Sequence, residues 1–328
     1  MTLERRSFIA ALGGAMTAWP FAAWPQQALP TIGFLSARSP EESAHLLVAF
    51  RQGLAESGIA EGQGTRIEYR WARGEYEKLP ALAAELVAIP VTVLATGGGE
   101  PAARAAKAAT ATVPIVAAFS SDPVKSGLVA SLSHPGGNVT GVSNLSASIE
   151  AKRLGLLHEL APQAKIFAAL FNPDFPTFDD QRADTVAAAQ SAGIDIRIFR
   201  ASTEGEIETA FDAMTQQQIA ALLVAADPFF NSRRAAIASI AAQRRVPAIY
   251  SFRDFAVAGG LISYGIDLPD VYRQVGVYTG RILKGAKPAD LPVLQPTKFE
   301  FVINMKAAKA LGLAITSNLL SLADEVIE

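Results

Sequence analysis

The sequence predicts an α/β fold of two similar lobes, each built on a parallel sheet with helices on both faces. Short apolar, β-branched runs alternate with helical patterns from end to end, and this alternation is typical of parallel sheets. The alternation forms two runs of four or five units, separated by GGNVTGVSN at 136–144, whose glycines suit a chain crossing between lobes. The 328 residues, of which 50% are hydrophobic, are enough for two domains with large cores.

The strands are the apolar, β-branched runs, and they fall into two series. The first series is expected at 31–36 (TIGFLS), 66–71 (RIEYRW), 91–96 (VTVLAT) and 114–119 (PIVAAF). The second series is expected at 165–171, 195–199, 219–226, 247–251 and 261–265.

Helical periodicity fills the intervals between these strands. In 41–57, Leu47, Phe50 and Leu54 share one face, and Gly58 ends the pattern. Further helices are expected at 77–88, 100–110, 146–160, 178–192, 204–216, 230–244 and 269–284.

The C-terminal region has a proline-punctuated stretch, then one more strand and helix. The chain could therefore return to the first lobe near residue 266 and cross again near 297. This predicts a first lobe of 29–142 plus 267–297 and a second lobe of 143–266 plus 298–328.

The N-terminus has the features of an export signal. Arg5 and Arg6 precede SFI and a mildly apolar stretch, which resembles a twin-arginine signal. The alternatives are a buried helix or an uncleaved anchor, but Pro20 and Pro25 interrupt the run, which is short for a bilayer helix. We therefore expect residues 1–28 to be a signal peptide that is removed on export.

Composition excludes several classes of protein. The chain has no cysteine, so it has no disulfide, thiolate metal site or cysteine nucleophile. A net charge of −2 offers no basic field for nucleic acid. His45, His134 and His158 lie on separate units without the spacing of metal ligands, so we expect no metal site.

Known catalytic patterns are also missing from the sequence. The segment Thr96-Gly-Gly-Gly99 follows a strand, yet it matches neither phosphate-binding fingerprint. There is no G-x-S-x-G elbow, and no residue set supplies a nucleophile, a base and oxyanion donors together. We therefore expect no enzymatic activity and no cofactor, and the glycines are expected to bring the backbone close to some other ligand.

Ligands of open parallel sheets bind outside the carboxyl ends of the strands. Three loops at that level run from a strand into Asp or Asn and then proline, at Asp122, Asn172 and Asp227. These residues could simply start helices, because Asp or Asn at the cap and proline next are preferred there. Alternatively, the loops face a shared cleft, where free N–H groups attract a carboxylate and the Asp side chains bind an ammonium or hydroxyl group.

Aromatic residues are concentrated at or just past the strand ends. Aromatic side chains with a few polar groups usually line small-molecule pockets, whereas about half of this set, above all Phe119 and Phe171, is expected in the cores. The set is Phe119, Phe171, Phe175, Phe178, Phe229, Phe230, Tyr250, Phe252, Phe255 and Tyr264.

The stretch PIVAAFSSDPVKSGLVASLSHPGGNVTGVSN, with ELAP, FNPDFP and the tail PTKFEFVINMKAAKALGL, resembles the ABC-transporter substrate-binding family whose studied members bind tryptophan or phenylalanine. The resemblance covers about 30 to 328. It implies a type I periplasmic-binding-protein fold, with two Rossmann-like lobes, three hinge crossovers and a ligand in the cleft. It also implies a protein that delivers its ligand to a membrane permease. We expect the protein to be periplasmic and monomeric.

The resemblance also places the ligand-binding loops of the family on this chain. They map onto Ser36, Ser39, Thr96, Gly97, Gly98, Ser120, Ser121, Asp122, Asn144, Asn172, Asp227, Tyr250 and Tyr264. Phe229 and Phe252 join this set as aromatic residues beside the same loops.

We expect an amino-acid-like or aromatic ligand. Its carboxylate would bind to the TGGG or SSDP loop, its amino group to Asp122 or Asp227, and its apolar body near Phe229, Phe252 or Tyr264. The lobes would close around it about hinge strands near 142–145, 264–267 and 296–299. Two alternatives stay open: a periplasmic sensory module that signals to a receptor, and an exported α/β hydrolase.

Overall fold

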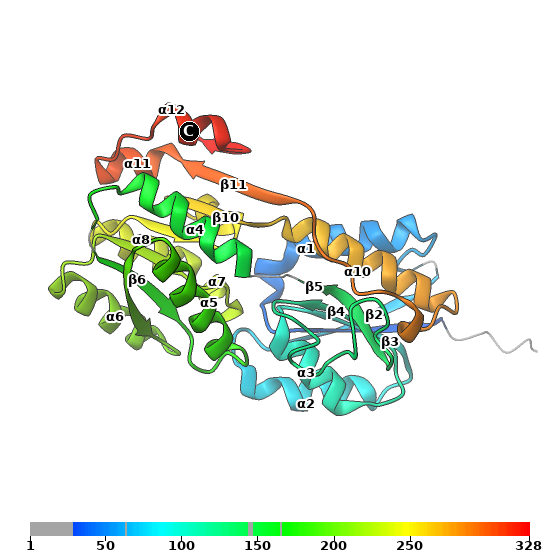
Figure 1. Ribbon diagram of the computed structural model, residues 1–328. Helices are drawn as coiled ribbons and strands as arrows, with labels where there is room; N and C mark the ends of the chain where they lie inside the picture. Colours follow the sequence, from blue (N-terminus) through cyan, green and yellow to red (C-terminus); the bar gives the residue numbers. More distant parts are fainter. Residues whose placement is uncertain (1–28, 63, 144–146, 165) are drawn as a thin grey trace, which may run out of the picture.

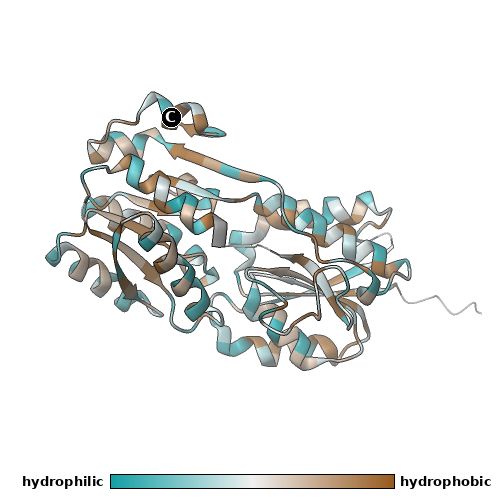
Figure 2. Ribbon diagram, viewed as in Figure 1, coloured by the Kyte–Doolittle hydropathy of each residue, from teal (hydrophilic) through white to brown (hydrophobic). Residues whose placement is uncertain are grey.

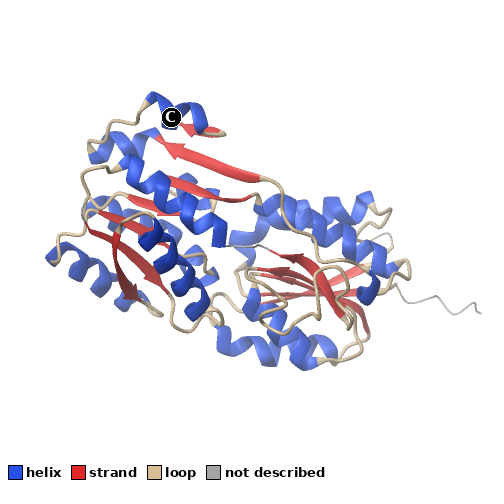
Figure 3. Cartoon of the chain, viewed as in Figure 1, coloured by secondary structure: helices blue, strands red, loops and turns tan. Residues whose placement is uncertain are grey.

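The computed structural model describes residues 29–62, 64–143, 147–164 and 166–328. The expected signal peptide and Asn144 lie outside these residues. The described chain forms two sheets, each covered by its own helices, in two lobes that lie side by side (Figures 1 and 3). The predicted α/β fold of two lobes is confirmed.

The first lobe has a five-stranded parallel sheet in the order β2-β1-β3-β4-β5. Side chains of one strand point alternately to opposite faces, so each face has its own core. Helices α1 and α10 cover one face, and α2 and α3 cover the other. The elements are β1 (Thr31–Ser36), α1 (Pro40–Glu56), β2 (Arg66–Trp71), α2 (Leu79–Val87), β3 (Val91–Gly97), α3 (Glu100–Ala109), β4 (Ile115–Phe119), β5 (Val139–Ser143) and α10 (Leu268–Leu283).

The second lobe has a seven-stranded sheet in the order β12-β11-β10-β9-β8-β6-β7. One face is covered by α4, α5, α11 and α12, and the other by α6 to α9. Its strands are β6 (Ile166–Phe171), β7 (Asp195–Arg200), β8 (Ala221–Val224), β9 (Ala248–Tyr250), β10 (Ile262–Ile266), β11 (Phe299–Asn304) and β12 (Glu325–Ile327). Its helices are α4 (Ala147–Leu160), α5 (Phe178–Ser191), α6 (Glu204–Gln216), α7 (Pro228–Ser232), α8 (Arg234–Gln243), α9 (Arg253–Val257), α11 (Met305–Leu311) and α12 (Ser317–Leu322).

This second sheet departs from the expected all-parallel arrangement at one pair, because β11 runs antiparallel to β10. The reason lies in the chain path. Strand β10 leads out of the second lobe toward α10 of the first lobe, and β11 brings the chain back, so the two neighbours point in opposite directions (Figure 1).

The segment expected to be only a crossing contains a strand. Strand β5 is buried throughout and pairs in parallel with β4. Its last residue, Ser143, also donates its N–H to the carbonyl of Leu294, at 2.7 Å. The chain thus completes the first sheet before it crosses, and the returning segment lies beside this crossing.

Two of the three possible helix starts do not begin helices, and one expected helix is divided. Asp122 accepts N–H groups of the following turn, and Asn172 accepts that of Asp174, but no helix begins at either place. Asp227 does cap a helix, the short α7. The expected helix at 230–244 is interrupted at Arg233, between α7 and α8.

Hydropathy follows this layering. The strands carry the brown, apolar residues, and the surrounding helices alternate brown and teal (Figure 2). Across the described ranges, every helix is too short or too polar to cross a membrane.

Candidate functional site

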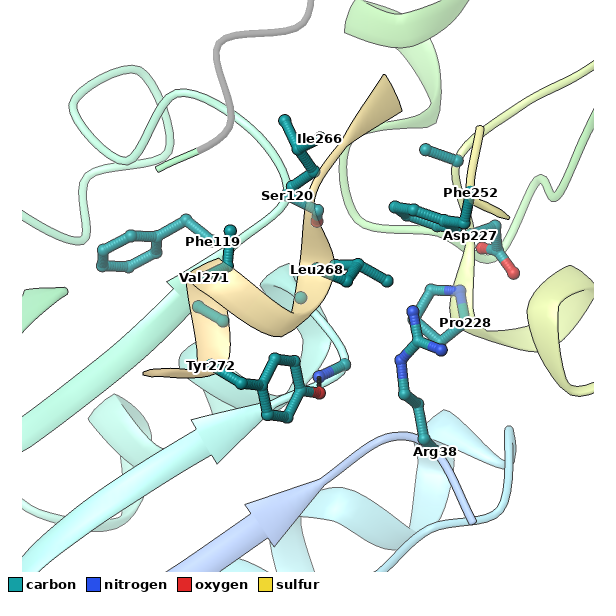
Figure 4. Close-up of a pocket in the computed structure, with 14 residues that line it drawn as sticks. Arg38, Phe119, Ser120, Asp227, Pro228, Phe252, Ile266, Leu268, Val271 and Tyr272 are labelled. Carbon is teal, nitrogen blue, oxygen red and sulfur yellow. Dashed lines mark hydrogen bonds between the residues drawn. The ribbon is translucent and has the colours of Figure 1, made fainter. Parts of the chain in front are cut away.

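A cavity with about 430 Å³ of empty space, part of which is open to solvent, lies between the lobes, at the carboxyl ends of β1, β3, β4 and β8 (Figure 4). Most of its lining is apolar, with one guanidinium and one carboxylate. The first lobe contributes Arg38, Gly98, Gly99, Ala118, Phe119, Ser120, Val271 and Tyr272; the second contributes Ala226, Asp227, Pro228 and Phe252; Ile266 and Leu268 lie at the crossing between them.

Arg38 lies in the loop between β1 and α1 and extends into this cavity (Figure 4). It is only 3% exposed, and its guanidinium lies 5.5 Å from the ring centre of Phe252 on the other lobe. Its Nε and Nη1 atoms have no hydrogen-bond acceptor within the described part of the chain. A buried cation without an acceptor is costly, so this side chain is suited to an anionic group of a ligand.

Asp227 lies on the opposite wall and is 2% exposed. Its Oδ1 accepts the N–H of Phe230 at 3.0 Å, and its Oδ2 accepts the hydroxyl of Tyr76 at 2.9 Å and the amide of Asn172 at 3.3 Å. Burial raises the pKa of this carboxyl to about 6, although the hydrogen bonds from Phe230, Tyr76 and Asn172 favour the ionised form. Near neutral pH the site therefore holds a buried anion.

The glycine loop contributes backbone rather than side chains. Gly98 and Gly99 have φ angles of +78° and +80°, which glycine adopts without strain. A Cβ atom on Gly98 would lie 2.9 Å from Ala37, and one on Gly99 would lie 2.6 Å from the hydroxyl of Ser120. The N–H of Gly98 donates to the hydroxyl of Tyr272 at 3.1 Å. The loop thus packs against its neighbours while it forms one wall of the cavity.

The serines after β4 hold the start of α3. The Ser120 hydroxyl accepts the N–H of Glu100 at 3.0 Å, and the Ser121 hydroxyl donates to its carboxylate at 2.8 Å. Glu100 is fully buried and also pairs with Arg104. Ser120 lines the cavity, whereas Ser121 is not part of its lining.

The structure brings four of the predicted site residues to the cavity wall: Gly98, Ser120, Asp227 and Phe252. Gly97 lies against Tyr272, and Asn172 is connected to the cavity through Asp227. Phe229 lines a separate, more polar opening, under the guanidinium of Arg233.

The other predicted residues of the first lobe lie outside the cavity lining. The Ser36 hydroxyl accepts the N–H of Arg38 at 3.1 Å, and Ser39 caps α1. Thr96 is buried in β3, and Asp122 caps a turn.

Two predicted aromatic residues of the second lobe lie in packed layers away from the cavity. Tyr250 stacks on Phe255, with ring centres 4.5 Å apart. Tyr264 stacks on Phe299 at 6.2 Å.

Three residues of the site were not singled out from the sequence: Arg38, Tyr76 and Tyr272. A sequence feature could have identified Arg38, because it is the only charged residue of the SARSP loop after β1. Tyr76 begins a 3₁₀ turn and Tyr272 lies within α10, and both reach the site only through tertiary packing, so no local pattern indicates them. No group of three or more His, Cys, Asp or Glu side chains in the described ranges could hold a metal ion.

Comparisons with known proteins agree with this geometry. The family model described as "ABC transporter substrate binding protein" matches residues 43–327. The tyrosine-binding protein of Clostridioides difficile (strain R20291) is 28% identical over 264 residues, which are 80% of this chain and 75% of that protein.

Solved structures give the same fold. The crystal structure of an ABC domain in complex with L-Trp from Streptococcus pneumonia has a TM-score of 0.84 and 30% identity, covering 92% of this chain and 100% of that one. A conserved domain protein from Vibrio cholerae O1 biovar eltor also has a TM-score of 0.84, with 26% identity over 90% of this chain and 99% of that one. A leucine binding protein from Thermotoga maritima, at 11% identity and a TM-score of 0.58, shares the fold over 78% of this chain and 81% of its own.

The two-lobed α/β fold is therefore that of a type I periplasmic binding protein. The family model spans almost the whole described chain. The chain belongs to the ABC transporter substrate binding protein family.

Proposed function

We propose that this protein is exported, captures an amino acid with an aromatic side chain in the cavity between its lobes, and delivers it to the membrane permease of an ABC importer. Residues 1–28 serve as the export signal in this proposal. The lobes move as bodies of 29–142 plus 267–297 and 143–266 plus 298–328, and the protein acts as a monomer.

The observation that carries the proposal is the pair of opposite charges on opposite walls of one apolar cavity. Arg38 of the first lobe has guanidinium atoms without an acceptor in the described chain, and Asp227 of the second lobe is a buried carboxylate. An α-amino acid carries both complementary charges on one carbon. Charge-assisted hydrogen bonds to both groups would satisfy Arg38 and compensate for the burial of Asp227.

The rest of the cavity supports an apolar ligand side chain. Phe252, Ile266, Leu268 and Val271 line it without polar side-chain atoms. Relatives described as a tyrosine-binding protein and as a complex with L-Trp make aromatic amino acids the first candidates.

Ligand binding would also favour closure of the lobes. Because Arg38 and Asp227 belong to different lobes, one ligand can contact both only when the lobes are together. A ligand shifts a conformational equilibrium by its differential affinity for the two states, and closure about hinge segments is the common motion of such binding proteins.

Calorimetry with the L-amino acids tests the proposal. We expect heat of binding with L-tryptophan, L-tyrosine or L-phenylalanine and none with charged amino acids. The absence of binding by every aromatic amino acid would overturn the aromatic assignment. Identification of a copurified ligand by mass spectrometry gives an independent answer.

Asp227→Asn tests the ammonium contact. Asparagine also caps helices, so α7 should persist, while loss of the buried charge should weaken binding by about 100-fold. Asp122→Asn is the matched control, because Asp122 lies in a similar strand-to-proline loop but outside the cavity lining. Calorimetry should show normal affinity for the control, and equal affinity of both variants would remove Asp227 from the site.

A further inference from the structure

We infer that Tyr76 is a positioning residue that reaches from the first lobe to hold the Asp227 carboxylate, so that the ligand site of the second lobe is complete only in the closed protein. This inference rests on the proposed function, in which the ligand binds between the lobes.

Tyr76 belongs to the first lobe by its place in the chain. It begins a short 3₁₀ turn (Tyr76–Lys78) between β2 and α2. Its hydroxyl donates to Oδ2 of Asp227 at 2.9 Å and accepts the N–H of Phe229 at 3.1 Å. Its ring also lies 6.3 Å from that of Phe175. All three of these contacts are with the second lobe, so they exist only while the lobes are together.

One oxygen of the Asp227 carboxylate can still accept a hydrogen bond from a ligand. Oδ2 accepts from both Tyr76 and Asn172, whereas Oδ1 accepts only the N–H of Phe230 among the described residues. A carboxylate oxygen can accept about two hydrogen bonds. Tyr76 and Asn172 therefore fix the orientation of the carboxylate from one side, and Oδ1 keeps capacity for an ammonium donor.

The hydrogen bond between Tyr76 and Asp227 also lies between the apolar cavity and a second, polar opening. Asp227 lines the apolar cavity, whereas Tyr76 lines an outer opening of about 740 Å³. The outer opening is polar, with carboxylates from both lobes at Glu75, Glu77, Asp174 and Glu204. Tyr76 thus separates the apolar cavity from this outer opening.

The Tyr76 hydroxyl also affects the pKa of the Asp227 carboxyl group. Its hydrogen bond lowers the pKa of Asp227, which burial raises, so removal of the hydroxyl should raise that pKa further. The other charged groups nearby are Arg38 of the first lobe, Arg233 of the second lobe and the carboxylates of the outer opening. None of these is changed by Tyr76→Phe.

Titration of L-tryptophan into the wild type and Tyr76→Phe between pH 5 and 8 tests the inference. We expect about 10-fold weaker binding by the variant at pH 7, consistent with loss of one hydrogen bond to a charged group. The pH below which affinity falls should also be higher in the variant, a change that a purely structural role would not produce.

Tyr278→Phe is the matched control. The Tyr278 hydroxyl donates to the backbone carbonyl of Pro292 at 2.9 Å, a phenolic hydrogen bond of the same length that stays within the first lobe. Its loss should leave both the affinity and its pH dependence unchanged. Equal behaviour of wild type and Tyr76→Phe would overturn the inference and leave the proposed function intact.

A distance measurement separates the two claims. The chain has no cysteine, so Ala84→Cys on α2 and Glu208→Cys on α6, both exposed, can be labelled selectively with a dye pair. We expect Tyr76→Phe to need about 10-fold more ligand for the same closure and to show a wider mean distance without ligand. If the wild type closes with no amino acid, the proposed function fails; if the unliganded distances of both proteins agree, the inference on Tyr76 fails.

Discussion

Arg38 and Asp227 are opposite charges that the fold buries in one cavity without an ion pair between them in the described chain. Arg38 is held by a loop that begins on Ser36 of its own lobe, whereas Asp227 is held by α7 and Asn172 of its own lobe and by Tyr76 of the first lobe. A buried charge without an ionic partner is costly, so the arrangement favours a ligand that carries both opposite charges.

The affinity for a ligand with an ammonium group should depend on pH. Burial raises the pKa of Asp227 to about 6, so the carboxylate is ionised above this pH and protonated below it. Because the ammonium binds the ionised form, affinity should be level above pH 7 and fall by up to about tenfold per pH unit well below pH 6. Calorimetry across pH 5 to 8 measures this, and Asp227→Asn should remove the dependence. A flat wild-type profile would contradict the role of Asp227.

At the scale of elements, α1 and α10 together position the first-lobe half of the site. They cross closely because glycines stand at the contact: a Cβ on Gly276 would lie 2.1 Å from the carbonyl oxygen of Phe50, and one on Gly53 would lie 1.9 Å from that of Arg273. The loop before α1 carries Arg38, and α10 carries Tyr272 to the cavity. The spacing of the helix pair therefore determines the width of the first-lobe wall.

Gly276→Ala should destabilise the protein by about 1–3 kcal/mol, because the methyl group has no room between the helices. Thermal unfolding followed by circular dichroism should show a lower Tm. Gly155→Ala in α4 is the control, since its added Cβ would meet nothing within 4 Å, and alanine favours an exposed helix by about 0.5–1 kcal/mol. A Tm of Gly276→Ala at or above that of the wild type would refute the close-packing argument.

The elements differ in how well the sequence predicts them. The runs TIGFLS and RIEYRW coincide with β1 and β2, because β-branched and aromatic runs bounded by breakers have few other structures. Strand β5 was missed because VTGVS contains a glycine and two hydroxyl residues, and tertiary pairing with β4 makes it a strand. The break at Arg233 was missed because apolar spacing continues through it.

At the scale of the whole molecule, the site is made of pieces that are far apart in the sequence. The lobes meet through Tyr76 and Asp227, through Glu42 and Arg234 at 3.6 Å, and through His45 and Asp254 at 3.4 Å. The sequence predicts a site in the loops that follow the strands, and the cavity lies there. Gly98, Ser120, Asp227 and Phe252 line its wall. Which further side chains line it depends on how the lobes close, and local sequence patterns do not specify that.

The central claim is that the cavity recognises both charges of an aromatic amino acid. Competition calorimetry with L-tryptophan, indole-3-propionate and tryptamine tests it most directly, because the second lacks the ammonium and the third lacks the carboxylate. The account predicts that each analogue binds at least about 10-fold more weakly than L-tryptophan, since each leaves one buried charge without its partner. Equal affinity for L-tryptophan and either analogue would contradict it.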